Sequence, residues 1–406
     1  MVLSGAVPTL IEEIEALSPT LKRRLAARGF SAEGLVARAA VAGKDRDGRN
    51  RLRGDVRPPL ASDVLDAPDP ASAEGERLRK KGLEAIARGE LALCVLAGGM
   101  ATRMGGVVKA LVEALPGRTF LDLRLAEIEH LSQQAGRRVP FWMMTSEATF
   151  GPIAAALGDK LDGRAIALFE QHVSLRLAPD GSLFRGADGE PDVYATGHGD
   201  LPDALRACGL LRDFRAAGGK YVWIANLDNL GASVDPALLG WFIERREPLL
   251  VEVVDKVAGD KGGGPVRFEG RRMIVEEFRL PLDFDPKTVP VFNTNTFLVE
   301  ADALDALAME WTYVEVEKKV DADKARSTAR VAADGAAAGR AGEGLTAIQF
   351  ERLLGEITAA IEPVFVRVPR EGAGSRFLPV KDVPELERRR PEIEIALRAR
   401  HILPSA

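Results

Sequence analysis

The stretch from Leu91 to Lys109, LALCVLAGGMATRMGGVVK, most constrains what this chain can fold into. Its apolar first part, Leu91 to Ala97, is typical of a buried parallel strand. The loop that follows carries glycines and basic side chains, namely Gly98, Gly99, Gly105, Gly106, Arg103 and Lys109. Backbone N–H groups of such a loop, with fixed positive charge nearby, can hold nucleotide phosphates at the carboxyl end of a strand. The alternative is an ordinary glycine-rich turn.

Neither of two common phosphate loops fits this stretch. The P-loop requires G-x-x-x-x-G-K-[ST], but Gly105 is followed by Gly106 and the lysine lies further on. The dinucleotide fingerprint requires G-x-G-x-x-G, and the run Gly98-Gly99-Met100-Ala101 departs from it at the second glycine. Phosphate binding here would belong to another class of loop.

The composition indicates a soluble globular protein that is not built for nucleic acid. The chain has 406 residues, of which 46% are hydrophobic and 28% charged, and its net charge is −5. Without a basic stripe, any anion site must be built locally. The first residues lack the basic start of a secretory signal, and no apolar run is long enough to span a membrane. We therefore expect a cytoplasmic protein without a membrane partner; the sequence indicates no oligomeric state.

From Leu91 onward, strand-like and helix-like segments alternate. This pattern predicts an α/β fold with a mostly parallel mixed sheet flanked by helices. We expect three regions: a helical N-terminal region (1–88), the catalytic core (89–380) and a charged C-terminal helix (381–406). Within the first region we expect helices at Thr9–Ala27 and Glu74–Gly89, separated by an irregular stretch from Asp45 to Pro70. Further on, the pattern predicts a helix at Gly344–Ile361, preceded by a mobile loop at 325–344.

A second motif is YVWIANLDNLG, from Tyr221 to Gly231. It predicts a hydrophobic strand that ends at Asn226, with Asp228 just beyond. A carboxylate at that position of an α/β sheet can hold Mg²⁺ against nucleotide phosphates. The alternative is an aspartate that caps the next helix or turn.

Other motifs carry weaker signals. In Thr196-Gly-His-Gly-Asp200, two glycines allow a ligand to approach the backbone beside His198, although a simple turn also explains them. The amide of Gln171 could hydrogen-bond a base edge. The loop Lys261–Gly264 could approach a sugar or a phosphate, but a hairpin connection explains it equally well. The amides of Phe292–Phe297 suit hydrogen bonds to sugar hydroxyls, but they also suit the start of a strand. Arg376 and Lys381 in SRFLPVK have the pattern of a solvated surface pair.

The order of these motifs resembles the eukaryotic-type family of UTP–glucose-1-phosphate uridylyltransferases, also called UDP-glucose pyrophosphorylases. The similarity runs from about Leu78 to Leu386 through the motifs quoted above, with TFLDLRLAEIEHL, DKGGG and SRFLPVKDVPEL among them. The resemblance implies a nucleotidyltransferase Rossmann-like fold. It also implies the Mg²⁺-dependent conversion of UTP and glucose 1-phosphate to UDP-glucose and pyrophosphate. Family members continue into a C-terminal β-helix, which we do not expect here in full.

The resemblance also implies site residues by position. Those implied in catalysis are Arg103, Lys109 and Lys381. Those implied in nucleotide binding are Ala97, Gly98, Gly99, Gln171 and Gly197. Those implied around the sugar phosphate are His198, Asn226, Gly263, Glu276, Asn293 and Asn295. The implied Mg²⁺ ligand is Asp228.

Three departures from the family pattern leave alternatives open. Ala101 replaces a glycine, Thr145 stands where an asparagine is expected, and Val107-Val108 precedes the lysine in place of Gly-Pro. One alternative is a pyrophosphorylase for another sugar 1-phosphate, such as galactose 1-phosphate or N-acetylglucosamine 1-phosphate. Another is a non-catalytic sensor of nucleotide sugars on the same fold.

Overall fold

The computed structural model describes residues 8–101, 104–186, 188–320 and 345–404. They form two compact units. The first unit comprises 1–51, 171–200 and 311–353, and the second comprises 52–170, 201–310 and 354–406. This division cuts across the expected boundaries at residues 88 and 380, because the chain leaves the second unit twice and returns to it.

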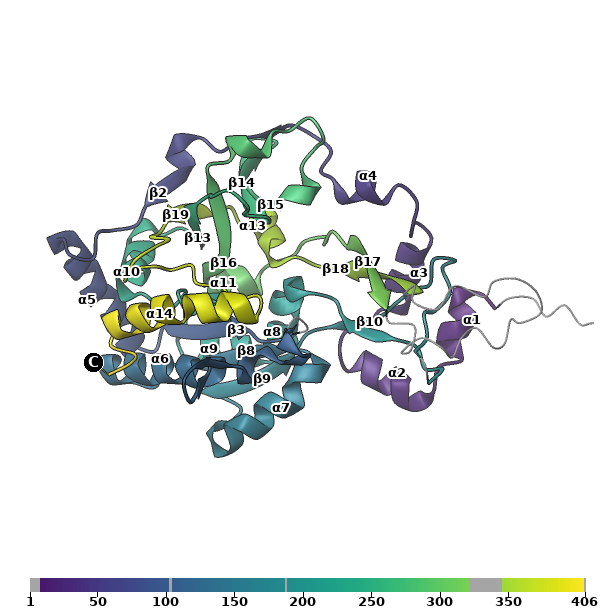
Figure 1. Ribbon diagram of the computed structural model, residues 1–406, viewed down its shortest axis with the longest axis horizontal. Coiled ribbons are helices and arrows are strands. Elements are labelled where there is room, and N and C mark those ends of the chain that lie inside the picture. The colour runs from purple at the N-terminus through teal and green to yellow at the C-terminus, as the bar shows by residue number, and fades with distance from the viewer. Residues whose placement is uncertain (1–7, 102–103, 187, 321–344, 405–406) are drawn as a thin grey trace, which may run out of the picture. The chain divides into compact units, whose positions relative to one another are not determined.

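The second unit contains an eight-stranded mixed sheet (Figure 1). The order of its strands is β2 (Val64–Asp66), β19 (Val364–Arg367), β13 (Leu249–Asp255), β16 (Val291–Glu300), β12 (Tyr221–Asn226), β3 (Leu91–Leu96), β8 (Phe141–Thr145) and β9 (Ile166–Glu170). Strand β16 runs antiparallel to both neighbours, and every other pairing in the sheet is parallel. The predicted mostly parallel mixed sheet is confirmed.

Helices cover this sheet, and the main core lies between sheet and helices. The helices of the second unit are α5 (Ala73–Ala87), α6 (Phe120–Ala135), α7 (Glu147–Leu157), α8 (Leu201–Ala207), α9 (Leu210–Ala216), α10 (Pro236–Arg245), α11 (Ala301–Asp305), α13 (Ile357–Ala360) and α14 (Val383–Ala399). Sequence signals set their ends: Thr119 caps α6 in a capping box with Asp122, and Gly136 ends it with φ 64°. Gly240 allows α10 to lie directly on α5, since a Cβ there would sit 2.0 Å from the carbonyl oxygen of Leu78.

Short strands complete the second unit. A three-stranded sheet consists of β1 (Val56–Arg57), β14 (Gly263–Phe268) and β15 (Arg271–Glu276), and two small pairs are β4 (Met100–Ala101) with β5 (Val107–Val108) and β6 (Glu113–Leu115) with β7 (Arg118–Thr119). The stretch from Asp45 to Pro70, expected to be irregular, thus contributes two strands. One of them, β2, forms the edge of the main sheet beside β19.

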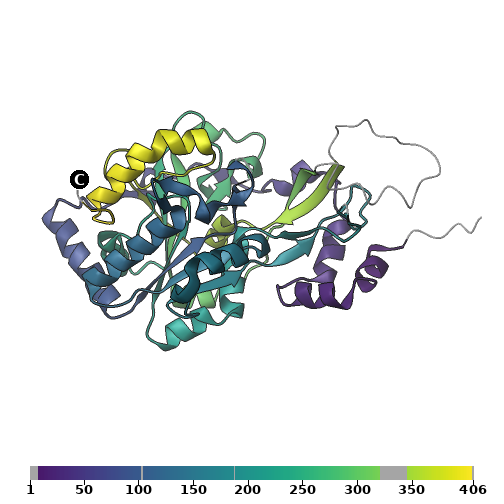
Figure 2. The same ribbon diagram turned by 60° about the horizontal axis from the view of Figure 1, so that its bottom comes forward.

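The first unit has its own small core. Its elements are α1 (Leu10–Glu15), α2 (Pro19–Ala26), α3 (Ala32–Ala39), α4 (Arg46–Asn50), β10 (Val173–Leu175), β11 (Val193–Ala195), β17 (Val314–Val320) and β18 (Leu345–Glu351). The purple helices α1 to α3 are visible in Figure 2. The single helix expected at Thr9–Ala27 is two helices, because Ser18 caps α2 and Pro19 occupies its first turn.

The prediction of a helix at Gly344–Ile361 is wrong. Residues Leu345–Glu351 form β18, which pairs antiparallel along its whole length with β17. The pattern of apolar residues there suits a helix as well as a strand, and pairing with a distant segment decides between them. Only Ile357–Ala360, at the end of the predicted span, is α-helical. The loop predicted at 325–344 lies outside the described residues.

Within the described part of the chain, no helix is both long enough and apolar enough to cross a membrane.

Candidate active site

Two loops of the second unit leave the carboxyl edge of the sheet from adjacent strands. Strands β3 and β12 pair in parallel, with Leu96 opposite Asn226. The backbone N–H of Leu227 still donates to the carbonyl of Leu96 (3.2 Å). The glycine-rich loop after β3 and the Asp228 loop after β12 therefore start side by side. Ligands in open α/β sheets bind at such carboxyl ends.

An ion pair joins these two loops. The Lys109 ammonium donates to the Asp228 carboxylate, and the two side chains are 20% and 17% exposed. The glycine-rich loop folds back on itself to place Lys109 there, because the N–H of Lys109 donates to the carbonyl of Gly99 (3.3 Å). Two residues that the sequence placed in one site, 119 positions apart, thus lie in direct contact.

The glycine-rich loop itself is anchored at its start. The N–H of Ala97 donates to the carbonyl of Met144 (2.7 Å), and the Ser146 hydroxyl donates to the carbonyl of Gly98 (3.0 Å). A Cβ at Gly99 would meet nothing within 4 Å, so space for a ligand adjoins its backbone. Arg103, which the sequence placed in catalysis, lies outside the described residues.

The departures at Ala101 and Thr145 have structural explanations. Ala101 lies in strand β4, paired with Val107, and is not among the residues with positive φ. The left-handed backbone falls instead on Gly105 (φ 87°) and Gly106 (φ 74°), so alanine introduces no strain. Thr145 is fully buried and donates to the carbonyl of Phe169 (3.0 Å), which joins β8 to β9. The Thr145 side chain therefore stabilises the pairing of β8 with β9.

Three asparagines form a cluster beside Asp228. Asn295 donates through Nδ2 to Oδ1 of Asn226 (2.8 Å), and its N–H donates to Oδ1 of Asn293 (3.0 Å). Asn295 has φ 59° and lies at a bulge, where the register of β16 against β13 shifts between Glu252 and Val253. Asparagine tolerates this conformation better than most residues do. The bulge places the three amides together at the strand ends.

Gly263 and Glu276 face each other across the β14–β15 hairpin. A Cβ at Gly263 would sit 2.9 Å from Oε1 of Glu276, so the carboxylate occupies the space of the missing side chain. Burial raises the pKa of Glu276, and the charge of Arg279 partly opposes that shift. A desolvated carboxyl group of this kind is suited to hydrogen-bonding sugar hydroxyls.

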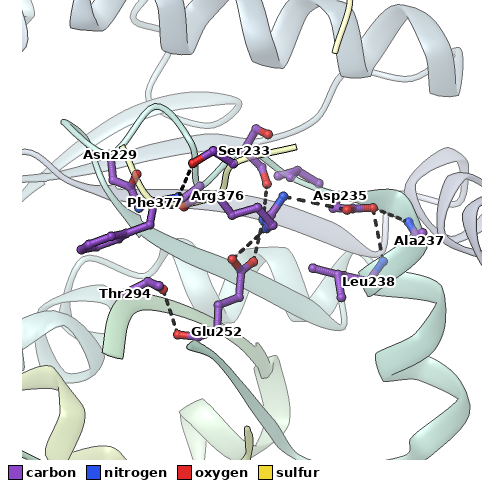
Figure 3. Close-up of polar contacts among 12 residues, drawn as sticks. Asn229, Ser233, Asp235, Ala237, Leu238, Glu252, Thr294, Arg376 and Phe377 are labelled. Atoms are coloured by element: carbon purple, nitrogen blue, oxygen red, sulfur yellow. Dashed lines mark hydrogen bonds and ion pairs between the residues drawn. The ribbon is translucent and has the colours of Figure 1, made fainter. Parts of the chain in front are cut away.

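The segment before Lys381 is held by Arg376, which is buried (Figure 3). Its guanidinium binds both oxygens of Glu252 (2.6 and 2.8 Å) and the carbonyl of Ser233 (2.7 Å). Asn229 fixes the adjoining backbone, accepting from the N–H of Leu378 (2.7 Å) and donating to the carbonyl of Arg376 (3.2 Å). The interpretation of Arg376 as a solvated surface charge is therefore wrong.

Lys381 itself is exposed, immediately before α14. Its backbone N–H donates to Oε2 of Glu385 (2.7 Å). Among the described residues, no ion pair is found for its ammonium group. The structure thus fixes the backbone of this residue and leaves its side chain in solvent.

Gln171, Gly197 and His198 belong to the first unit. Gln171 is buried, and it is the residue at which the chain re-enters the first unit. The glycines around His198 pack on the backbone of Arg352: a Cβ at Gly197 would sit 2.5 Å from its carbonyl oxygen, and one at Gly199 would sit 2.7 Å from its carbonyl carbon. These glycines are thus required by the fold. Burial lowers the pKa of His198 to about 4, so its imidazole is neutral at pH 7.

Arg124, which no sequence motif pointed to, organises the Asp228 loop. Arg124 lies on α6 with no exposed surface and pairs with Glu127 one turn further on (2.7 Å). Its remaining bonds go to backbone carbonyls of the loop, those of Asn226, Leu227, Asn229 and Ala232. Glu127 in turn accepts from the N–H of Val234 (2.8 Å). The available signal in the sequence was an arginine between two leucines in the segment TFLDLRLAEIEHL.

The arrangement defines an α/β protein in which a lysine and an aspartate meet in an ion pair at the carboxyl edge of the sheet, where two loops leave adjacent strands. The model of the family described as UTP–glucose-1-phosphate uridylyltransferase matches residues 59–388. The chain belongs to this family.

Individual relatives agree with this assignment. A probable UTP–glucose-1-phosphate uridylyltransferase of Schizosaccharomyces pombe is 29% identical over 94% of this chain and 74% of its own length. The enzyme of that name from Hordeum vulgare is 31% identical over 73% of this chain and 61% of its own length. A crystal structure titled UDP-glucose phosphorylase, from Trypanosoma brucei, has a TM-score of 0.71 at 23% identity, over 91% of this chain and 77% of that one. This likeness establishes the fold.

We predict that Arg124→Lys destabilises the second unit by about 3 kcal/mol, because one ammonium cannot satisfy the buried carbonyls and pair with Glu127 at once. Urea unfolding measures the change. Arg118→Lys, on the exposed strand β7, is the matched control and should stay within about 0.5 kcal/mol of the parent. Equal unfolding midpoints for both variants would contradict the role given to Arg124.

Proposed function

We propose that this protein is a nucleotidyltransferase that makes UDP-glucose and pyrophosphate from UTP and glucose 1-phosphate. The contact between Lys109 and Asp228, at the edge between β3 and β12, carries the proposal. It unites a cation for phosphates and a carboxylate for a metal in one place. Family membership and the names of the relatives support the same reaction.

In this reaction a phosphate oxygen of glucose 1-phosphate attacks the α-phosphorus of UTP. The bond from that phosphorus to the bridging oxygen of the β-phosphate breaks, and pyrophosphate leaves. The nucleophile is already ionised, so no general base is needed. Because both reactants are anions, the site must position them and offset their repulsion. Lys109 and Lys381 are the cations we assign to that task, with Arg103.

The donor set near Asp228 fits Mg²⁺. The described residues contain no group of three or more histidine, cysteine, aspartate and glutamate side chains that could enclose a metal. Magnesium commonly uses one or two carboxylates together with substrate phosphates and waters. We therefore assign Asp228 as its protein ligand. When bound, the ion would supply neutralisation of phosphate charge.

The remaining residues are assigned to recognition. We propose that Gly98 and Gly99, with Ala97 before them, present backbone to the nucleotide, and that Gln171 and Gly197 contact uracil. We assign His198 to the sugar phosphate by its place in the family motif. By the same criterion we assign to the sugar five residues of the second unit, namely Asn226, Gly263, Glu276, Asn293 and Asn295. Desolvated amides and a carboxyl group suit hydroxyl recognition.

Pyrophosphate release tests the proposal. Purified protein with UTP and Mg²⁺ should release pyrophosphate fastest with glucose 1-phosphate, and more slowly with galactose 1-phosphate or N-acetylglucosamine 1-phosphate. A different preferred sugar would reassign the sugar-binding residues. No release with any sugar, from protein that still binds UTP, would overturn the reaction and favour a sensor.

The variant Asp228→Asn should raise the Mg²⁺ concentration for half-maximal rate about tenfold or more, since a neutral amide replaces a carboxylate ligand. Magnesium titrations of the steady-state rate measure this. Asp255→Asn, at the end of β13, removes a carboxylate from another strand end and should leave the titration unchanged. Superimposable titrations for Asp228→Asn and the parent would exclude Asp228 as the ligand.

For Lys381→Ala we expect kcat to fall roughly 10²-fold, by loss of positive charge in the transition state. The exposed side chain makes the fold insensitive to this change, and Lys381→Arg should retain part of the rate. Lys80→Ala, an exposed lysine on α5, serves as the control. A near-parental kcat for Lys381→Ala would remove the residue from the catalytic set.

A further inference from the structure

Two of the groups assigned to the reaction, Asp228 and Lys381, lie on separate segments of the second unit. Asp228 belongs to the loop after β12, and Lys381 ends the segment 375–381, which leads into α14 and is called the Lys381 segment below. Both groups are assigned to the phosphates, so they can act together only if their relative position is fixed. Contacts between the two segments must fix it, because the side chain of Lys381 itself is exposed.

Asn229 binds the Lys381 segment through both ends of its side-chain amide. Its Oδ1 accepts from the N–H of Leu378 (2.7 Å), and its Nδ2 donates to the carbonyl of Arg376 (3.2 Å). Asn229 is 1% exposed and lies beside the segment at Phe377 (Figure 3). An amide carries a donor and an acceptor on separate atoms, so this side chain pairs with the backbone in the way that a residue of a neighbouring strand does.

The backbone of Asn229 is fixed on the side of Asp228, the residue before it. The N–H of Asn229 donates to the carbonyl of Asn226 (3.3 Å). Its carbonyl accepts from the N–H of Ala232 (2.9 Å) and from the guanidinium of Arg124 (2.6 Å). Asn229 therefore cannot move without moving the loop that carries Asp228.

The chain from Leu378 to Lys381 is short and is anchored at both ends. Leu378 and Val380 are buried in the main core, and the N–H of Lys381 donates to Oε2 of Glu385 (2.7 Å) in the first turn of α14. Apolar packing is not directional, whereas the two hydrogen bonds of Asn229 have a preferred length and angle. These bonds therefore set where the backbone lies, and a displaced Leu378 would displace Lys381 with it.

Other contacts between the two segments lie further from both assigned groups. The guanidinium of Arg376 donates to the carbonyl of Ser233 (2.7 Å). Arg400 donates to the carbonyls of Ser375 (2.5 Å) and Leu230 (3.4 Å). These contacts hold the start of the segment. Loss of the asparagine amide would therefore release the later part of the segment and leave its start in place.

We propose that Asn229 is a positioning residue for the reaction, whose amide sets the position of the Lys381 ammonium relative to Asp228. The inference rests on the proposed function and adds to it a residue that acts through its neighbours in the chain. Without the amide, the lysine would remain present but would meet the transition state in a poorer geometry. The chemical step would slow, while binding of UTP, which is assigned to other segments, would not change.

A double-mutant cycle on pyrophosphate release, at saturating UTP, glucose 1-phosphate and Mg²⁺, tests this role. Asn229→Ala should lower kcat about tenfold, and a UTP titration should give a KM within about twofold of the parent. In the Lys381→Ala background the same change should lower kcat less than about twofold, because no ammonium is left to misplace. Asn229→Asp keeps the acceptor for Leu378 and lacks the donor for Arg376, so we expect a smaller loss with the same dependence on Lys381.

Asn50 supplies the matched control. It is a buried asparagine of the first unit, 8% exposed, whose amide likewise bonds distant backbone: it accepts from the N–H of Glu315 (3.0 Å) and donates to its carbonyl (2.9 Å). Asn50→Ala should lower the urea unfolding midpoint much as Asn229→Ala does. Any change in kcat that Asn50→Ala causes should be the same with and without Lys381, since independent effects multiply.

The cycle separates a positioning role from a merely structural one. An equal fold-loss of kcat for Asn229→Ala in the parent and in Lys381→Ala overturns the inference, as does a parental kcat for Asn229→Ala. If Asn229→Ala does not fold, the cycle with Asn229→Asp decides by the same comparison. A parent protein that releases no pyrophosphate overturns the proposed function, and this inference with it.

Discussion

The buried guanidinium of Arg124 is the interaction on which the Asp228 loop depends. A chain that leaves a strand inside a protein carries carbonyl groups with no partner in the sheet, and such groups are costly when buried. Arg124 satisfies four of them. Its charge is balanced by Glu127, whose second oxygen accepts from Val234. Two side chains one turn apart on α6 therefore fix both ends of the loop, and Asp228 is held between them.

A second buried pair, Arg376 with Glu252, plays the corresponding part for the segment before Lys381. Glu252 is also where the register between β13 and β16 shifts, and that shift places Asn295 in its left-handed conformation. One strand position thus supports both the lysine segment and the asparagine cluster. The polar groups of the site lie on loops and a bulge, and buried ion pairs give these irregular segments the rigidity that a binding site requires.

The sequence was sufficient where a local pattern decides the structure. The apolar runs at Leu91–Ala97 and Tyr221–Asn226 predict two of the parallel strands, β3 and β12. The contact between Lys109 and Asp228 is not itself predicted; the resemblance implies only that both residues serve one site. The sequence was insufficient where distant segments decide: β18 is a strand only because β17 pairs with it. The burial of Arg376 depends likewise on Glu252, 124 residues away, and the glycines around His198 on the backbone of Arg352. No pattern within one segment contains these partners.

The contact of Lys109 with Asp228 also has a consequence for how an anion can enter. In this acidic chain, a phosphate that recruits the Lys109 ammonium takes away the partner of Asp228 and lies beside its carboxylate. Two like charges at short range repel, most strongly where water is partly excluded. A divalent cation that accompanies the phosphate removes this repulsion by binding Asp228. On the proposed function, the ion pair therefore opposes binding of bare UTP and favours UTP together with Mg²⁺, so discrimination between the two follows from one contact between neighbouring strand ends.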